Sequence, residues 1–414
     1  MMKKKVYLLR FITEFYIIIG LWGMMKTKNE SNEGFYLITV VYFLLFIICL
    51  SGNKFKCCMD IMSLIPLMMI GVWCYGCIFG IIHGNNIRYV LRNFSGMLLY
   101  ILVYFFNSAN IKIERINKLL LRLSVCLSIL TPIAYFFLFV IPDQRGWFVL
   151  KIPFLNAFAT GIELTGFAVV YSGAHCLLTI SYGYCLYQCI NRDKYINKYL
   201  LFAVFDILVA VAFGKSGGLE LEILMMTGVM IFFPFLKKIT SKKTILLILG
   251  ITAFILFINR VGLKPLLSIF DPGDEGNSTR YGQINYIFNN LSIFGHGLGA
   301  EYIAIKKGYG IEFIYGDLLY KFGIFGVIPI VIYFYTLIKS IKILAKSHGD
   351  WSDIIPFALM GYTFYALGNP VLFSGSSVIS HILALIYIKE KEKQNNHERS
   401  MRKCIEYQYS TRSV

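Results

Sequence analysis

The segment GFYLITVVYFLLFIICL, residues 34–50, contains no charged side chain. Apolar runs of similar length recur along the 414-residue chain, and about 20 apolar residues suffice to cross the hydrocarbon layer of a bilayer as a helix. Hydrophobic residues make up 57% of the chain and charged residues 15%, whereas a soluble domain carries about a quarter charged residues. The composition therefore predicts a polytopic integral membrane protein.

The apolar runs predict an all-α bundle of about twelve transmembrane helices. Lys3, Lys4 and Lys5 give the chain a positively charged start, as in a signal peptide, but no small-residue cleavage site follows the first apolar run. We therefore interpret this run as a membrane helix and not as a signal peptide. We expect residues 1–388 to form a single transmembrane domain and residues 389–414 a basic cytoplasmic tail. The predicted spans are 6–25, 34–50, 59–82, 88–106, 118–141, 162–186, 199–213, 218–236, 244–259, 314–338, 352–367 and 370–388.

The basic residues of the loops predict the orientation. With the N-terminus placed in the cytoplasm, the cytoplasmic stretches carry roughly twice as many Lys and Arg residues as the outside stretches. Because cytoplasmic loops are enriched in positive charge, we expect both termini in the cytoplasm. This topology accounts for most of the net charge of +17 without a nucleic-acid partner, and the basic tail is expected to face membrane lipids.

The longest interruption between spans, residues 260–313, is predicted to lie outside. Its middle has the spacing of an amphipathic helix, with apolar residues at Tyr281, Ile284, Phe288 and Leu291. Such a helix would lie in the membrane interface with its apolar side toward the lipid and hold Arg280 at headgroup depth. The alternative is a loop helix that packs over the bundle without a further role.

The stretch FGHGLG, residues 294–299, ends this helix. Its three glycines permit sharp turns and close approach of the backbone to a ligand, and they leave His296 displayed at the turn. A histidine can exchange a proton near neutral pH, as general acid–base catalysis requires. An exposed loop histidine without a role is the alternative interpretation.

Cationic side chains gather at the same predicted level of the membrane. They are Arg88, Arg92, Arg145, Lys151 and Lys215. Together they would suit an anionic ligand such as a lipid diphosphate, although ordinary contact with phospholipid headgroups explains each of them taken singly. The stretch DPGDEG, residues 271–276, has the composition of a turn, and the sequence contains no metal-spaced His/Cys cluster. We therefore predict no metal and no cofactor.

Several motifs follow one another in the second half of the chain. Arg280 precedes the Phe-Gly-x-Gly-x-Gly stretch 294–299, then comes GDLLYKFGIFG at 316–326, and finally GNP at 368–370. This layout resembles the O-antigen and capsule polymerase/ligase superfamily, of the Wzy type. The similarity in layout covers nearly the whole chain, whereas the specific matches lie between Arg280 and Pro370.

The resemblance implies a metal-independent, GT-C-like glycosyltransferase in the bacterial cytoplasmic (inner) membrane. Its substrate would be a polyprenyl-diphosphate-linked oligosaccharide, polymerised at the extracytoplasmic face into an O-antigen, capsular polysaccharide or exopolysaccharide. A flippase and a chain-length regulator of the same pathway would be its partners. The reaction requires removal of a proton from an acceptor hydroxyl and stabilisation of the departing diphosphate, which arginine can supply.

The resemblance also implies roles for individual residues. Arg280 matches the loop arginine and is the expected diphosphate ligand, followed by Lys215 and Arg145, with Tyr281 beside them on the substrate. Lysine at position 215 stands where the superfamily often has arginine, which puts bidentate binding in doubt. Ligases of the superfamily tend to have His-Asn where this chain has Gly316-Asp317, and this difference favours a polymerase. The general base stays open among His296, Glu301, Glu312 and Asp317.

Two other classes of protein compete with this hypothesis. A flippase or another transporter would use titratable groups at membrane depth, which are Glu14, His175, Asp206, Lys321 and His381. We find no internal repeat of the kind many transporters have, and the polar residues concentrate at one face. A purely structural membrane scaffold leaves the long outside segment unexplained.

Overall fold

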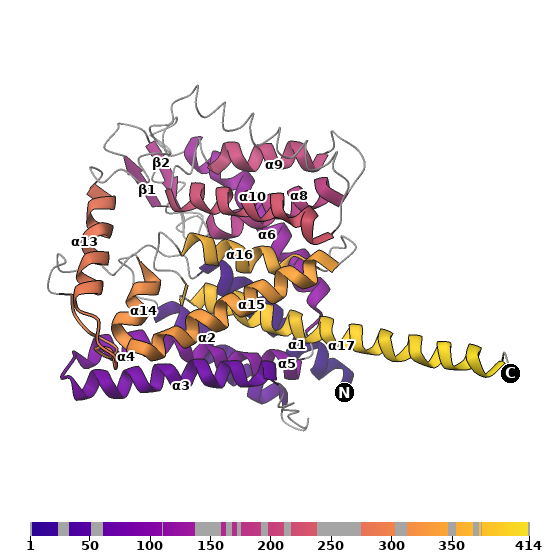
Figure 1. Cartoon of the computed structure of the whole chain (residues 1–414), viewed down its shortest axis with the longest axis horizontal. Helices are drawn as coiled ribbons and strands as arrows, with labels where there is room; N and C mark the ends of the chain where they lie inside the picture. The colour runs from indigo at the N-terminus through magenta and orange to yellow at the C-terminus, as the bar shows by residue number, and fades with distance from the viewer. Residues whose placement is uncertain are drawn as a thin grey trace.

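The structure, a computed structural model of the whole chain, is a bundle of helices with one short hairpin of strands (Figure 1). It describes residues 2–23, 33–50, 61–109, 111–136, 159–162, 168–171, 175–191, 198–210, 217–237, 275–302, 313–346, 353–366, 372–373 and 375–412.

The elements of the first half are α1 (Met2–Gly23), α2 (Glu33–Leu50), α3 (Ile61–Ile82), α4 (Ile87–Ser95), η1 (Gly96–Ile101), α5 (Leu102–Ala109), α6 (Ile113–Tyr135), β1 (Ala159–Ile162), β2 (Ala168–Tyr171), α8 (His175–Asn191) and α9 (Lys198–Leu208). Those of the second half are α10 (Gly217–Lys237), α13 (Glu275–Asn289), α14 (Ile314–Phe322), η6 (Gly323–Gly326), α15 (Val327–Lys346), α16 (Ile355–Tyr365) and α17 (Gly375–Arg412).

Four helical segments of the described part are long and apolar enough to cross a membrane: Leu64–Ile82, Ile87–Ala109, Ile113–Ile133 and Ile314–Lys346. The outward faces of the helices agree with this, because large apolar side chains such as Phe11, Ile47 and Val331 are exposed on them. A soluble protein rarely exposes apolar surface on this scale. These features are those of a helical membrane protein, as the composition predicts.

The centre of the bundle is formed by α16 and the first half of α17. Every residue of α16 is buried, and so are residues 377–388 of α17. The helices α8 and α10 pack against α16, whereas α1, η1 and α15 pack against α17. A helix that is apolar all round is expected in such a central position.

The helix ends gather at two opposite ends of the bundle (Figure 1). At one end α13 packs against α14 and runs across the direction of α3. Three ion pairs join other parts of the bundle: Arg115 of α6 with Glu14 of α1 at 3.3 Å, Lys339 of α15 with Glu392 of α17 at 2.8 Å and Lys391 of α17 with Asp353 at 3.2 Å. The two sides expected from the loop charges, and which of them faces the cytoplasm, stay predictions.

The prediction of one helix over 162–186 is wrong in its first part. Ala159–Ile162 and Ala168–Tyr171 pair as antiparallel strands, and the helix α8 begins only at His175. The reason lies in the local residue types, since the β-branched Val169 and Val170 favour a strand and Gly161 weakens a helix.

Other predicted boundaries shift. The run 87–109 contains the 3-10 segment η1, and the run 314–346 is interrupted at Gly323, which has a φ of 58°. The helix α17 continues without a break past residue 388 to Arg412, so the predicted tail extends the last predicted span. The predicted span 244–259 lies outside the described residues, and the count of about twelve spans stays a prediction.

Candidate functional site at the glycine-rich loop

The loop that follows α13 is held against the membrane helices by its three glycines. Gly295, Gly297 and Gly299 have φ values of 76°, 77° and 74°, a region that other residues rarely adopt. A Cβ at Gly297 would overlap the backbone of Gly80 in α3, and one at Gly295 would overlap the carbonyl group of Lys321. The glycines therefore permit a close approach between this loop and two helices, where the sequence predicted an approach to a ligand.

Hydrogen bonds fix the loop on both sides. The His296 and Gly297 N–H groups donate to the carbonyl oxygens of Tyr320 (2.9 Å) and Lys321 (2.8 Å) in α14. On the other side, the Leu298 N–H donates to the Gly76 carbonyl of α3 at 2.8 Å. The loop thus joins α3 to α14.

His296 lies half-buried in this arrangement, where the sequence predicted a displayed side chain. Its ring stacks on that of Tyr320 with centroids 4.3 Å apart, and its Nε2 lies 2.7 Å from the carbonyl oxygen of Asn290. Because a carbonyl oxygen only accepts, Nε2 carries the proton in this contact. A neutral His296 then has its lone pair on Nδ1, the atom with which it could take up a proton.

Asp317 of α14 is the centre of a second polar group. Its Oδ2 pairs with Lys321 Nζ at 2.9 Å, and the two side chains are only 12% and 14% exposed. Its Oδ1 accepts from the Tyr302 hydroxyl, while Lys321 Nζ also donates to Asn93 Oδ1 in α4 at 2.9 Å. This ion pair therefore connects α14, α4 and the loop.

Aromatic rings link the histidine to the aspartate. Tyr320, on which His296 stacks, lies 4.7 Å from the ring of Tyr302, and Tyr286 of α13 lies 6.0 Å from both tyrosine rings. Burial, together with the charge of Asp317, raises the pKa of Tyr302 well above its ordinary value. Tyr302 therefore stays a neutral hydroxyl that donates to Asp317, and it is no candidate for the general base.

The residues of the predicted amphipathic helix lie in α13, and the position of this helix in the membrane interface stays a prediction. Gln283 and Ile287 are buried against the protein, whereas Tyr281 and Phe288 are exposed, as is Leu291 just after the helix. The apolar stripe therefore points away from the bundle, and a different side of the helix contacts α14. The spacing of apolar residues along a helix identifies an apolar stripe, but it does not show whether protein or lipid covers that stripe.

The structure brings together part of the predicted site. His296 and Asp317 lie in the same cluster, Tyr281 is exposed on α13 and Glu301 is exposed in the loop. Arg280 belongs to α13, which lies at this end of the bundle, and its side chain is outside the description. Lys215, Arg145 and Glu312 lie outside the described residues.

Three residues of the cluster were missed or misplaced by sequence reasoning. Lys321 was assigned only to the transporter hypothesis, and its spacing of four residues from Asp317 is the signal that could have paired them. Tyr302 and Asn93 carried no sequence signal, because nothing local connects them to Asp317.

Two of the titratable groups that favoured a transporter, Asp206 and His381, have partners inside the bundle. Asp206 is fully buried and accepts from the hydroxyls of Ser128 (2.6 Å) and Ser181 (2.8 Å). His381 contacts the Tyr100 hydroxyl at 2.5 Å and the Thr336 hydroxyl at 3.0 Å. These contacts are well suited to holding helices together, since polar side chains bond across helices in membrane proteins.

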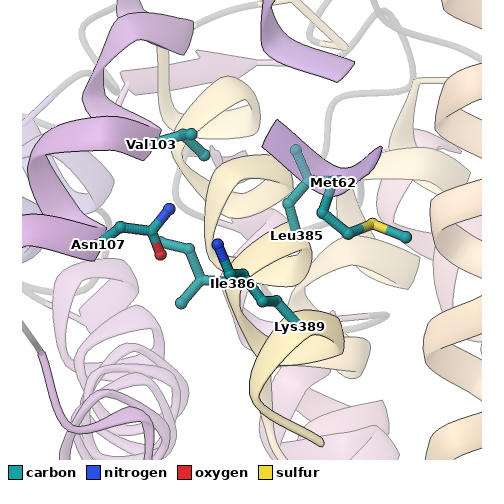
Figure 2. A pocket seen from close by; sticks show the side chains of 6 residues that line it. All are labelled: Met62, Val103, Asn107, Leu385, Ile386 and Lys389. Atoms are coloured by element: carbon teal, nitrogen blue, oxygen red, sulfur yellow. The ribbon is translucent and has the colours of Figure 1, made fainter. Parts of the chain in front are cut away.

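A small groove lies at the opposite end of the bundle, between α3, α5 and α17 (Figure 2). Its lining residues are Met62, Val103, Asn107, Leu385, Ile386 and Lys389. It encloses about 10 Å³, which is no more than one water molecule needs. A sugar does not fit there, so the groove is not a substrate site.

The chain was compared with protein-family models and with curated proteins. No protein-family model matches the chain, and no curated protein matches it significantly. Within the described residues no group of three or more His, Cys, Asp or Glu side chains could hold a metal ion. The fold and the cluster therefore define a helical membrane protein with a polar, tyrosine-lined group at one end of its bundle.

Proposed function

We propose that this protein is a polysaccharide polymerase of the bacterial cytoplasmic membrane. It transfers a growing glycan from polyprenyl diphosphate to the terminal sugar of a new lipid-linked repeat unit at the extracytoplasmic face. In this proposal both termini are cytoplasmic, and the end of the bundle that carries α13 is extracytoplasmic.

The observation that supports the proposal best is the convergence of the motif segments. The Phe-Gly-x-Gly-x-Gly loop and the segment 316–326 carry the resemblance to the polymerase superfamily, and they contact each other through the His296–Tyr320 and Gly297–Lys321 hydrogen bonds. Tyr320, on which His296 stacks, and Tyr302, which donates to Asp317, connect the proposed proton acceptor to the ion pair through ring contacts. A site assembled from separate chain segments is what a two-substrate transfer needs, because both reacting groups must be oriented.

The proposed reaction is a displacement at the anomeric carbon. The acceptor hydroxyl oxygen bonds to that carbon, the bond from the carbon to the diphosphate oxygen breaks, and the acceptor proton goes to the general base. His296 Nδ1 is the base in this proposal because Asp317 is already engaged by Lys321 and Tyr302. Glu301 is exposed to solvent, and a base in bulk water offers less positioned catalysis.

The leaving diphosphate is stabilised by cations at this end of the bundle. Arg280 on α13 is the main ligand of the diphosphate in this proposal, and Lys215 and Arg145 contribute additional positive charge. Arg88, exposed on α4, lies on the same helix as Asn93, the partner of Lys321, and adds a further positive charge near the site. Arginine binds phosphate oxygens in a bidentate fashion, so no metal is needed for this role.

The first test is the Arg280→Ala variant in cells, with surface glycan resolved on a gel. We expect the polymer ladder to disappear while single repeat units remain on the lipid carrier, because the leaving group loses its main counter-charge. Lys342→Ala, which removes an exposed cation from α15, is the matched control and should leave the ladder intact. Unchanged polymer length in the arginine variant would remove Arg280 from the mechanism.

A strain without the gene separates the proposal from its alternatives. One repeat unit without a ladder indicates a polymerase, whereas lipid-linked units trapped on the cytoplasmic leaflet indicate a flippase. A complete polymer that stays on the polyprenyl carrier indicates an O-antigen ligase. A flippase and a chain-length regulator are expected as partners in the pathway, and deleting the regulator should change only the length distribution of the ladder.

A further inference from the structure

The backbone of the glycine-rich loop lies beside the interior of a membrane-spanning helix and not beyond its end. Leu298 N–H donates to the carbonyl of Gly76, six residues before Ile82, the last residue of α3. At 1.5 Å per residue this contact lies roughly 9 Å below the end of the helix. The polar stretch HGNN that follows Ile82 marks where the apolar segment ends.

A second apolar segment, Ile314–Lys346, also contacts the loop. The Ile324 N–H donates to the Ile293 carbonyl at 2.9 Å, just after the interruption of this segment at Gly323. Tyr75 of α3 donates its hydroxyl to the Phe294 carbonyl at 2.7 Å. Two independent helices therefore place residues 293–298 within the depth range of the apolar segments.

Most backbone polar groups of residues 293–298 have hydrogen-bond partners in the protein. The Asn85 amide donates to two loop carbonyls, those of His296 (2.8 Å) and Leu298 (2.9 Å). With the contacts above, the carbonyls of Ile293 and Phe294 and the N–H groups of residues 295–298 also have partners. A loop in water needs no such arrangement, whereas non-helical backbone at membrane depth persists only where protein satisfies it.

The outward side chains of the loop are apolar and continue a lipid-facing surface. Ile293 and Phe294 are 73% and 57% exposed. Phe294 stacks on Phe79 of α3 at 6.1 Å, and Ile293 adjoins the exposed Ile324. The exposed apolar side chains of the loop therefore adjoin exposed apolar side chains of two candidate membrane-spanning segments.

We infer that residues Leu291–Leu298 form a re-entrant segment that enters the hydrocarbon region of the bilayer leaflet at this end of the bundle, with Ile293 and Phe294 in contact with lipid acyl chains. The inference concerns depth alone and does not depend on the proposed function. It places His296, as part of this segment, and Asp317 beside it at the border of the hydrocarbon region of that leaflet.

Spin-label accessibility tests the depth directly. The label is attached to Ile293→Cys in the full chain without its native cysteines, in lipid nanodiscs, and its collision rates with oxygen and with a water-soluble nickel chelate are compared. Ile78→Cys, on the exposed face of α3, is the lipid control, and Glu301→Cys, exposed in the same loop, is the water control. We expect the oxygen-to-nickel ratio at Ile293 to match Ile78 and to exceed Glu301 several-fold.

A ratio at Ile293 equal to that at Glu301 would overturn the inference. If the cysteine-free chain does not fold, the unmodified chain serves with a tryptophan at Phe294 or, for comparison, at Glu301. Brominated lipid chains should then quench the added emission at Phe294 several-fold more than at Glu301. Equal quenching at the two positions would likewise show that the loop lies in water.

Discussion

Asp317 and Asp206 are both shielded carboxylates, but their surroundings differ. Asp206 is surrounded by α6, α8 and α9 and is held by two serine hydroxyls. Asp317 lies at the end of the bundle, where it pairs with Lys321 and accepts from a loop tyrosine. The first carboxylate is enclosed by neutral groups, whereas the second belongs to a charged cluster. The comparison teaches that two buried carboxylates of one bundle can differ in the charge of their partners.

The largest effect is expected where the loop touches α3. Gly297→Ala places a Cβ into the backbone of Gly80 and forces an unfavourable φ, at a combined cost of roughly 2–5 kcal/mol. We expect a lower thermal unfolding temperature in detergent, measured by fluorescence-detected size exclusion, together with loss of the polymer ladder.

Gly84→Ala is the matched control for this change. Gly84 has a φ of 72° but no atom within 4 Å of an added Cβ, so this variant is subject only to the backbone strain, about 1–2 kcal/mol. Equal destabilisation by the two variants would show that overlap with Gly80 adds nothing to the loss of stability in Gly297→Ala.

The ion pair should couple stability to activity. Lys321→Ala leaves Asp317 shielded without its cation and should cost about 3 kcal/mol. The double variant Asp317→Asn/Lys321→Met removes both charges and should recover most of the thermal stability without recovering polymer synthesis. Asp206→Asn is the comparison: it disturbs the serine contacts, and activity per folded molecule should stay close to that of the unaltered protein.

Loss of activity in Asp206→Asn at unchanged stability would reverse the contrast between the two carboxylates. It would move the functional site from the end of the bundle to its interior and support the transporter hypothesis.

His296→Ala should affect chemistry more than stability. A positioned general base contributes about 10²- to 10⁴-fold to rate, so polymer synthesis should fall by that range while the unfolding temperature changes little. The assay is incorporation of labelled repeat units into polymer by membranes that contain equal amounts of protein. His296→Gln retains the ability to donate to Asn290 and should be equally inactive, which separates proton transfer from support of the loop.

Tyr302→Phe is expected to have the smallest effect. It removes one hydrogen bond to Asp317, which is worth about 1–2 kcal/mol because the acceptor is charged, and it keeps the ring contacts with Tyr320 and Tyr286. We expect a small decrease in unfolding temperature and reduced but measurable polymer synthesis. Complete inactivity would mean that Tyr302 contacts the substrate and does more than position Asp317.

Sequence reasoning succeeded where a property is local. The helices around residues 34–50 and 61–82 follow from apolar composition, and the spacing of Tyr281 and Phe288 identifies the apolar stripe of α13. It was wrong about residues 162 and 168–171, where short-range strand preference competes with apolar content, and it expected His296 to be displayed. The motif glycines were correctly singled out, but the partner that they approach was not.

The sequence by itself determined the helical character and the apolar segments long enough to cross a membrane, because each is a sum over neighbouring residues. Only the tertiary structure decided that Tyr75 bonds to Phe294, 219 positions away, that Lys321 donates to Asn93 of another helix, and that α13 turns its apolar stripe outward. The physical reason is that these contacts depend on how finished helices pack, and packing depends on shape across the whole bundle. The residue pattern of one segment therefore does not specify which other segment it will pack against.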